Sequence, residues 1–358
     1  MTNTQNVIET NTKPCNNMYV AQTSPALNQL NNANKKRLTN VKTTTEKDAK
    51  TGKDIMKATC QYKNIKLEKV QTTQQTRFNF NEFVSKIDLL AQVRLAKNPE
   101  NRVIDFDSLE LQELLGLPQS DNTRRNLNRW LKDAVDTLVG LSIMRTDTEN
   151  EKNSKNEPFF DKIVIYSRGV YPNSRNLKRL NRDEKAMHPE STVEFKLGHA
   201  YLFFSTDFLD HIKQKHQITL IAPKLFKLTG SAFYVYNALL NNKQINYKNS
   251  AIRQDTMKIG TLLDRCPVLP TWNEVAQSNR HFYDRIVEPL EAALNEINSE
   301  VDYVFLNKNR EQVKSINNLP LNEFLDSYIQ IANWKTLDVE QLNKIKRLKP
   351  KTKGKDNK

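Results

Sequence analysis

The two halves of the chain present the same order of expected secondary structure. In the first half, apolar spacing and β-like runs predict a helix, a strand, two helices and further strands, at 78–95, 102–106, 108–115, 121–140, 143–145, 162–166, 193–197 and 201–204. In the second half, the same patterns predict three helices and a strand, at 232–240, 256–263, 278–297 and 301–305. A repeated order of elements indicates two similar units in tandem.

The residues of the two halves can also be aligned. The segment 114–116 is placed beside 262–264, and the later helix is shifted by a further eight residues. Apolar positions then coincide along the helix, and the arginines that coincide are Arg124 with Arg280 and Arg129 with Arg285. Pro289 has no counterpart in the first half, and it predicts a kink or a break in the last helix.

Helix, strand, helix, helix and strands is the order of a winged-helix domain, a relative of the helix-turn-helix motif. Polar residues such as Asn, Thr, Gln and Lys crowd the first seventy positions, a composition typical of segments that do not fold. We therefore expect an α+β fold of two tandem winged-helix domains with disordered basic tails. The expected divisions are an N-terminal tail, two winged-helix domains and a C-terminal tail, at 1–76, 77–220, 221–334 and 335–358.

Charge is concentrated at the two ends of the chain. The formal net charge is +14 and the isoelectric point about 9.5, which favours an anionic partner such as nucleic acid. However, residues 1–76 hold 12 Lys and Arg against 5 Asp and Glu, and residues 335–358 hold 9 against 3. Each tail is as well explained by solubility as by phosphate contact, so an argument for DNA has to come from local patterns between them.

The helix expected at 121–140 carries such a pattern. Its apolar stripe comprises Leu127, Trp130, Leu131, Ala134, Leu138 and Leu141. The opposite face holds Arg125, Asn128, Arg129 and Lys132, with Arg124 at the edge of the stripe. A helix fits the major groove, where Arg recognises guanine, Asn recognises adenine, and Lys or Arg neutralises phosphate. This face is therefore predicted to bind DNA, with an ordinary solvated face as the alternative.

Two further groups are candidates for DNA contact. The equivalent helix of the second half offers Arg280, His281 and Arg285, although Asp284 and Glu288 lie among them. The connection from 171 to 191 in the first half is rich in basic residues, and Arg175, Lys178 and Arg179 are its candidates for DNA contact. A basic loop between strands is suited to phosphates or the minor groove. The alternative is a disordered insertion, because such a segment would have the same polar and basic composition.

No pattern in the sequence indicates a catalytic site, a metal site or a cofactor-binding site. The five histidines are dispersed, and neither a phosphate-binding G-x-x-x-x-G-K-[ST] loop nor a G-x-G-x-x-G motif occurs. Tyr234 and Tyr236, which a nicking enzyme could use as nucleophiles, are expected in the core. The three distant cysteines fit a reducing compartment, and no apolar run is long enough to cross a bilayer. A cytoplasmic protein with no membrane contact is expected.

The two-unit arrangement, from Leu114-Leu115-Gly116 to Leu138 and from Lys227 through Tyr236 to Ile297, resembles the replication initiators of theta-type bacterial plasmids. The resemblance covers roughly 78–310 and depends on architecture and apolar pattern, without a short diagnostic motif. It implies binding of double-stranded DNA at origin repeats, opening of the duplex, recruitment of the host initiator and helicase, and dimers that act as repressors. A winged-helix transcriptional repressor or partition regulator remains the alternative, followed by a rolling-circle nicking enzyme.

Overall fold

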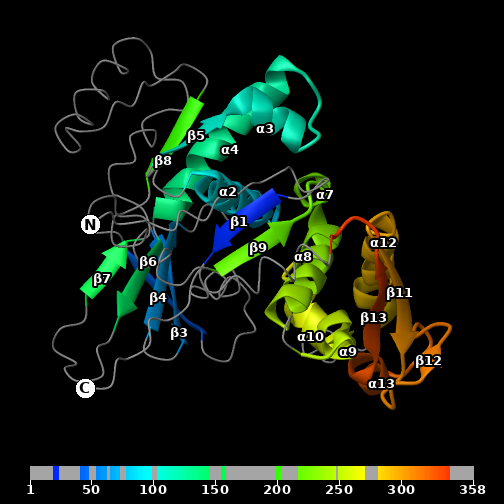
Figure 1. Cartoon of the computed structure of the whole chain (residues 1–358). Coiled ribbons are helices and arrows are strands. Elements are labelled where there is room, and N and C mark those ends of the chain that lie inside the picture. The colour runs from blue at the N-terminus through cyan, green and yellow to red at the C-terminus, as the bar shows by residue number, and fades with distance from the viewer. Residues whose placement is uncertain are drawn as a thin grey trace, which may run out of the picture.

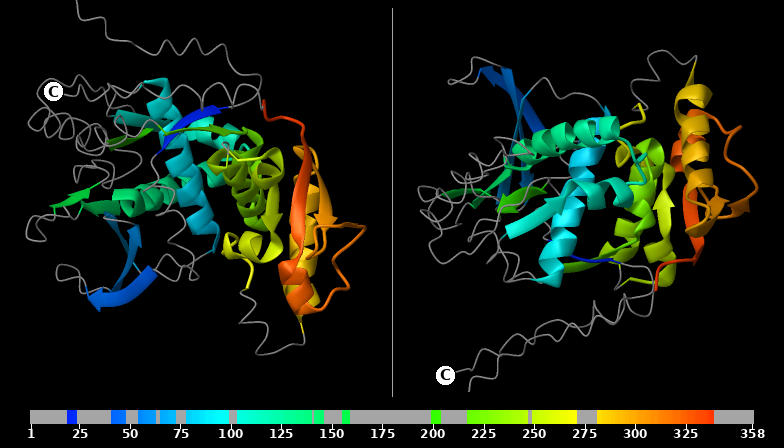
Figure 2. Two further views of the ribbon diagram at one scale, coloured as in Figure 1. Left: turned by 60° about the horizontal axis from the view of Figure 1, so that its bottom comes forward. Right: turned by 90° about the horizontal axis from the view of Figure 1, so that it is seen from above.

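The chain is an α+β protein, as predicted, with helices and mostly antiparallel strands (Figure 1). The computed structural model describes residues 19–23, 41–47, 54–62, 65–72, 78–98, 103–139, 141–145, 155–158, 199–203, 217–246, 249–270 and 281–338. Within these residues, no helix is long and apolar enough to cross a membrane. Helix α8 lies between the helices of the first half and the sheet of the second half in every view (Figure 2).

The first strands lie in the segment for which no structure was expected. They are β1 (Tyr19–Thr23), β2 (Val41–Lys47), β3 (Asp54–Tyr62) and β4 (Ile65–Thr72). Strands β2, β3 and β4 form antiparallel neighbours in a five-stranded sheet of order β2-β3-β4-β6-β7. The expectation of a disordered tail over 1–76 is therefore wrong for these strands. Their Thr, Val and Ile residues favour strands, but the many Lys, Gln and Thr residues among them leave few large apolar side chains, which explains the error.

The first unit follows the expected order of elements. It comprises α2 (Phe78–Lys97), β5 (Val103–Asp107), α3 (Ser108–Leu114), α4 (Asp121–Val139), β6 (Leu141–Arg145), β7 (Lys155–Pro158) and β8 (His199–Phe203). Strand β5 pairs antiparallel with β8, whereas β6 pairs with β4 and β7. The strands expected at 162–166 and 193–197 lie outside the described residues.

Two polar caps fix where α3 and α4 begin. The carboxylate of Asp107 accepts a hydrogen bond from the backbone N–H of Leu109 at 2.9 Å, and the hydroxyl of Ser120 accepts one from Thr123 at 3.1 Å. From the sequence, Ser108 and Asp121 were expected to cap these helices, but the observed caps lie one residue earlier and Ser108 and Asp121 are the first helical residues. Helix α3 is followed by Gly116, whose φ of 66° favours glycine and turns the chain toward α4.

The second unit contains more elements than the sequence predicted. They are β9 (Gln217–Ile221), α7 (Lys224–Lys227), α8 (Gly230–Ile245), α9 (Ala251–Asp255), β10 (Thr256–Lys258), α10 (Ile259–Asp264), η4 (Tyr283–Val287), α12 (Glu288–Glu296), β11 (Val301–Leu306), β12 (Gln312–Val313), α13 (Leu321–Asp326) and β13 (Tyr328–Trp334). Residues 256–258, expected as helix, form β10 instead. The π-helical turn η4 passes directly into α12, whose second residue is Pro289, and the backbone remains helical at the junction. The last helix therefore changes its winding before Pro289 and is not broken there.

Strand β13 holds the sheet of the second unit together. It pairs antiparallel with β10 on one side and with β11 on the other, and the sheet order is β10-β13-β11-β12. Residues 335–337, expected as the start of a C-terminal tail, instead belong to the second unit. The ammonium group of Lys335 donates to the carbonyl of Asn298 at 2.7 Å, and Leu337 is buried. Residues 339–358 of that expected tail lie outside the described residues.

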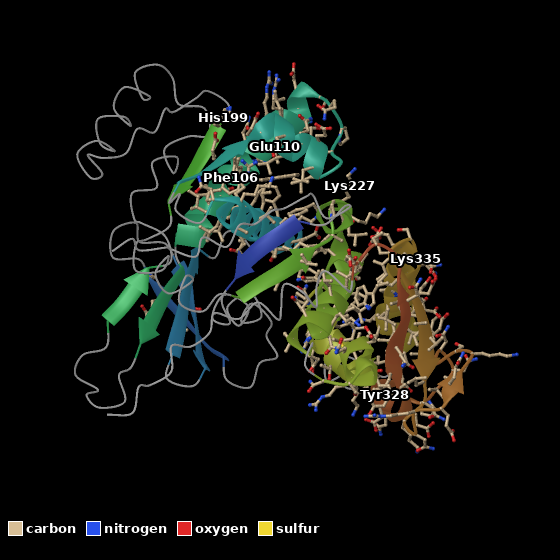
Figure 3. All side chains as sticks on the ribbon, viewed as in Figure 1. Phe106, Glu110, His199, Lys227, Tyr328 and Lys335 are labelled. Atoms are coloured by element: carbon tan, nitrogen blue, oxygen red, sulfur yellow. The ribbon has the colours of Figure 1, made fainter. Side chains whose placement is uncertain are left out.

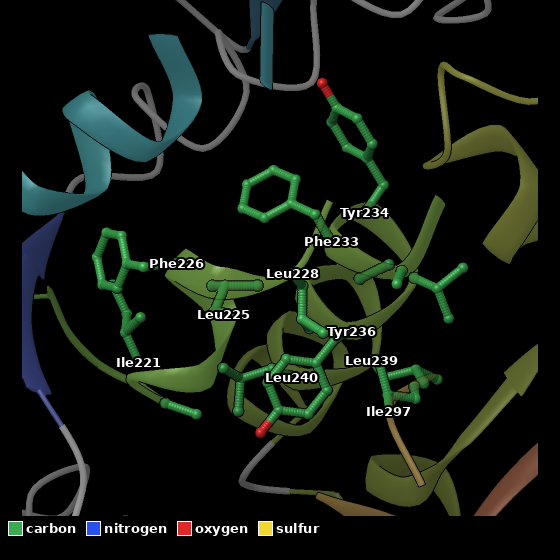
Figure 4. Close-up of a cluster of buried hydrophobic side chains, with 14 of the residues drawn as sticks. Ile221, Leu225, Phe226, Leu228, Phe233, Tyr234, Tyr236, Leu239, Leu240 and Ile297 are labelled. Atoms are coloured by element: carbon green, nitrogen blue, oxygen red, sulfur yellow. The ribbon is translucent and has the colours of Figure 1, made fainter. Parts of the chain in front are cut away.

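Helix α8 supplies the centre of the hydrophobic core (Figure 4). Phe233, Tyr236 and Leu240 are almost fully buried, and Leu225 and Phe226 of α7 join them. The core continues from α8 into the helices of both units without a boundary of exposed residues. The two units therefore share one core and do not fold around separate ones.

A buried ion pair joins the two units. Glu82 and Lys86 of α2 lie 2.7 Å apart, with side-chain exposures of 9% and 6%. The Lys86 ammonium also donates to the carbonyl of Leu228 at 2.6 Å, and the Glu82 carboxylate accepts from the backbone N–H of Gly230 at 2.7 Å. Because Lys86 bonds to the residue that ends α7 and Glu82 bonds to the first residue of α8, this ion pair fixes α2 of the first unit against the junction of α7 and α8 in the second.

Candidate nucleic-acid interface

The first turns of α4 expose the arginines that were predicted from the sequence to contact DNA. Arg124, Arg125 and Arg129 are all exposed. Arg124 is engaged by Asp121 of the same helix at 2.5 Å, and Arg129 donates to the side-chain oxygen of Asn126 at 3.3 Å. Arg125 makes no hydrogen bond or ion pair among the described residues. Arg125 and Arg129 thus present two guanidinium groups without a carboxylate partner.

The predicted apolar stripe of α4 is shifted around the helix. Asn128, predicted for the DNA-binding face, is only 6% exposed, and Trp130, predicted for the core, is 39% exposed. The helix buries Val135 together with Leu131, so its inner face turns toward the Asn128 side. The ring of Trp130 still packs edge-on against Phe83, with centroids 6.1 Å apart. Asn128 as a base-contacting residue is therefore wrong for this structure.

Several candidates of the first unit lie outside the described residues. The side chain of Lys132 is one of them. The whole connection from 171 to 191 is another, including Arg175, Lys178 and Arg179. The predictions for these residues stay predictions.

The equivalent helix of the second unit exposes basic groups only at its start. His281 and Arg285 are exposed, and Arg280 lies outside the described residues. The His281 ring nitrogen Nδ1 is 3.5 Å from the carboxylate of Asp284. Glu288 is exposed one turn further along. The acidic residues that the sequence places among the candidates are therefore exposed on the same part of the helix as His281 and Arg285.

A basic loop that was not predicted from the sequence lies between β11 and β12. Lys308 and Arg310 are exposed at its tip. The side-chain oxygen of Asn307 accepts hydrogen bonds from the backbone N–H groups of Asn309 and Glu311, at 2.9 and 3.0 Å. These bonds fix the loop before any ligand arrives. The signal was present in the sequence as Asn307-Lys308-Asn309-Arg310 directly after the expected strand.

Arg310 is held in an unusual conformation at the tip of this loop. Its φ of 67° is the only positive value of a non-glycine residue in the described part of the chain. Its guanidinium lies 5.5 Å from the ring centroid of Tyr328, at the start of β13 (Figure 3). A left-handed backbone costs an L-residue about 1 kcal/mol or more. The stacking on Tyr328 offsets part of that cost and keeps the charge near the loop.

The two candidate nucleophiles lie in the core, as predicted. Tyr236 is fully buried and Tyr234 nearly so, and they project from different sides of α8 (Figure 4). Burial raises the pKa of both hydroxyls well above the usual value, and for Tyr234 the nearby Glu82 carboxylate raises the pKa further. Within the described residues, no group of His, Cys, Asp and Glu is arranged to hold a metal ion.

A cleft of about 520 Å³ lies between α2, β5, α3 and α7. Its charged lining residues are Arg94, Lys97, Lys227, Asp105, Glu110 and Glu113. Glu110 and Lys227 are both visible in Figure 3. Arg94 is bound to Glu110 at 2.6 Å. Because the basic and acidic side chains balance, the cleft lacks the positive charge that a nucleic-acid surface requires.

Comparisons with known proteins find similarity among solved structures but not among sequences. No model of a protein family matches the chain, and no curated protein matches its sequence. Among solved structures, the chain is similar to domains 2 and 3 of RctB, with 12% sequence identity and a TM-score of 0.41. The similarity covers 83% of this chain and 93% of that one. Values this low do not establish a common fold, so the proposals below depend on the residues and topology of this chain.

Proposed function

We propose that the protein is a plasmid replication initiator that binds repeated double-stranded DNA sites through two winged-helix units. The observation that carries the proposal is the topology of the second unit. Helix α8, strand β10, helices α10 and α12, and strands β11 and β13 follow one another in the order of a winged helix, and β13 pairs between β10 and β11. The basic loop at Lys308 and Arg310 then occupies the position of the wing.

The first unit supports the same proposal with fewer paired strands. Helix α2, strand β5, and helices α3 and α4 repeat the order of the second unit, and β5 pairs with β8 as β10 pairs with β13. Helix α4 would be the recognition helix, with Arg125 and Arg129 toward DNA. An exposed arginine can bind guanine through two hydrogen bonds or neutralise a phosphate.

Two such units on one chain would cover two successive major grooves, about 10 base pairs apart. The shared core and the Glu82–Lys86 ion pair between α2 and α8 would keep that spacing constant. The protein would act without a catalytic residue or cofactor, in the cytoplasm, and would recruit the host initiator and helicase to the origin. Dimers would serve as repressors of the protein's own gene.

The alternative is a winged-helix repressor or partition regulator with the same fold. Both functions need the same DNA contacts, so the arrangement of binding sites decides between them. Direct repeats beside an AT-rich segment favour an initiator, whereas a single palindrome in the promoter favours a repressor. A nicking enzyme requires a covalent DNA adduct at Tyr234 or Tyr236, and the burial of both hydroxyls disfavours it.

A footprint on the DNA that flanks the gene is the direct test. The wild-type protein is expected to protect regularly spaced repeats. Arg125→Ala/Arg129→Ala and His281→Ala/Arg285→Ala are each expected to weaken binding at least about tenfold, because each removes side chains from one recognition helix. The control is Arg253→Ala, which removes an exposed arginine of α9, away from both recognition helices. Protection without repeats, or protection that neither double variant reduces, would contradict the proposal.

Substitutions in the loop between β11 and β12 are expected to change DNA affinity and its dependence on salt. Lys308→Ala/Arg310→Gly should weaken binding to all duplexes by a similar factor and lower the slope of log affinity against log salt by about 2, because two phosphate contacts are lost. Glycine at position 310 keeps the left-handed backbone without strain, so the melting temperature should not fall. Titrations of specific and random duplexes at several salt concentrations measure both effects. A change in sequence preference would mean that the loop contacts bases instead.

A further inference from the structure

Arg265 lies in the turn that follows α10. Its backbone N–H donates to the carbonyl of Leu262 at 3.0 Å and closes the end of the helix. The next residue, Cys266, is fully buried and lies against the first turn of α8, with its sulfur 3.9 Å from the carbonyl of Ser231. The backbone of Arg265 is therefore fixed at the edge of the core. Its guanidinium can explore only a small region around the end of α10.

The guanidinium of Arg265 has no partner in the described part of the chain. No hydrogen bond, ion pair or ring contact reaches it, although the residue is partly buried. Burial lowers its pKa, and no carboxylate acts in the opposite direction. A guanidinium carries five N–H donors and loses water when it is buried, so leaving it without acceptors is unfavourable. An anion from outside the chain would remove this cost.

The internal repeat has an apolar residue at the position aligned with Arg265. When 114–116 is aligned with 262–264, the counterpart of Arg265 in the first unit is Leu117. Leu117 is partly buried and packs against the core. The two turns differ in backbone geometry, because α3 is followed by Gly116 at φ 66° whereas α10 is capped by Arg265 itself at φ −94°. Arg265 nevertheless places a partly buried positive charge where the aligned residue of the first unit is a leucine.

We propose that Arg265 is a phosphate-binding residue that holds the backbone of the bound DNA at the end of α10. This inference rests on the proposed function. In a helix-turn-helix arrangement the first of the two helices crosses the DNA backbone, and α10 is that helix in the second unit. The planar guanidinium matches the geometry of a phosphate group and can donate two parallel hydrogen bonds to it. The contact would position the second unit on the duplex without selecting a sequence.

The test is Arg265→Leu, which installs the residue of the first unit. Its melting temperature is expected to equal or exceed that of the wild type, because a desolvated charge is removed. Its affinity is expected to fall about tenfold for specific and random duplexes alike, and the salt slope should decrease by about 1. Arg253→Leu removes the same charge from an exposed site on α9, and it should leave affinity and slope close to the wild-type values.

Three results would overturn the inference. A lower melting temperature of Arg265→Leu with wild-type affinity and slope would make Arg265 a structural residue. In the second result, inorganic phosphate raises the melting temperature of the wild type but not of Arg265→Leu, and the two proteins bind DNA with the same affinity. This result would identify a site for free phosphate instead of DNA. A wild-type protein that binds no duplex would refute the proposed function as well, which distinguishes that failure from the first two.

Discussion

Changing Lys86 to methionine is expected to lower the free energy of unfolding by about 3–5 kcal/mol, the cost of leaving a buried charge without its partner. In the wild type the Lys86 ammonium contacts the Glu82 carboxylate, the carbonyl of Leu228 and, at 5.3 Å, the ring of Phe233. Methionine fills a similar volume but satisfies neither oxygen. Because these contacts join α2 to α8, both units should lose stability together.

Urea unfolding followed by circular dichroism measures this loss. Lys97→Met, at an exposed position of the same helix, is the matched control and should change stability by no more than about 0.5 kcal/mol. The double variant Glu82→Gln/Lys86→Met should be more stable than Lys86→Met, since glutamine carries no charge and still accepts from Gly230. If Lys86→Met unfolds like the wild type, the ion pair does not join the units.

Changing Gln244 to alanine is expected to cost about 2–5 kcal/mol, because two buried backbone groups lose their partners at about 1–3 kcal/mol each. Gln244 is 2% exposed. Its side-chain oxygen accepts from the backbone N–H of Leu220 at 2.7 Å, and its amide donates to the carbonyl of the same residue at 2.9 Å. One glutamine on α8 thus takes the place of a neighbouring strand at Leu220 of β9.

Thermal unfolding and hydrogen exchange at Leu220 measure this effect together. The backbone N–H of Leu220 should exchange faster in Gln244→Ala, which a general loss of packing would not restrict to this strand. Asn241→Ala is the control on the same helix, since the Asn241 side chain bonds only to Asn237 among the described residues. A change in stability no larger than that of the control would show that water replaces the lost bonds.

The sequence predicted the long helices of both units from their apolar residues. Helices α2, α4 and α8 overlap the expected 78–95, 121–140 and 232–240, although α8 buries side chains on nearly every side and not along one stripe. The face of α4 was predicted less well. Trp130 is large and apolar, but its position next to the exposed Arg129 leaves it at the margin of the core, while the small polar Asn128 is buried.

Contacts between distant residues account for what the sequence did not predict. Strand β10 has only three residues, and its conformation is imposed by pairing with β13, more than seventy positions later. The strands before α2 depend on pairing with one another, and their polar composition conceals it. The unpartnered guanidinium of Arg265 is likewise invisible without coordinates, because burial and missing acceptors are properties of the folded chain.

The pairing of β1 with β9 limits how early the chain can fold during its synthesis. Tyr19 lies opposite Ile221, so the ends of this two-stranded sheet are separated by about 200 residues of nascent chain. At about 5–20 residues per second, a ribosome needs roughly 10–40 s to produce the second strand after the first. During that interval β1 has an unpaired edge. The sheet of β1 and β9 can therefore form only after the start of the second unit has left the ribosome. The first unit consequently reaches its final fold late in translation.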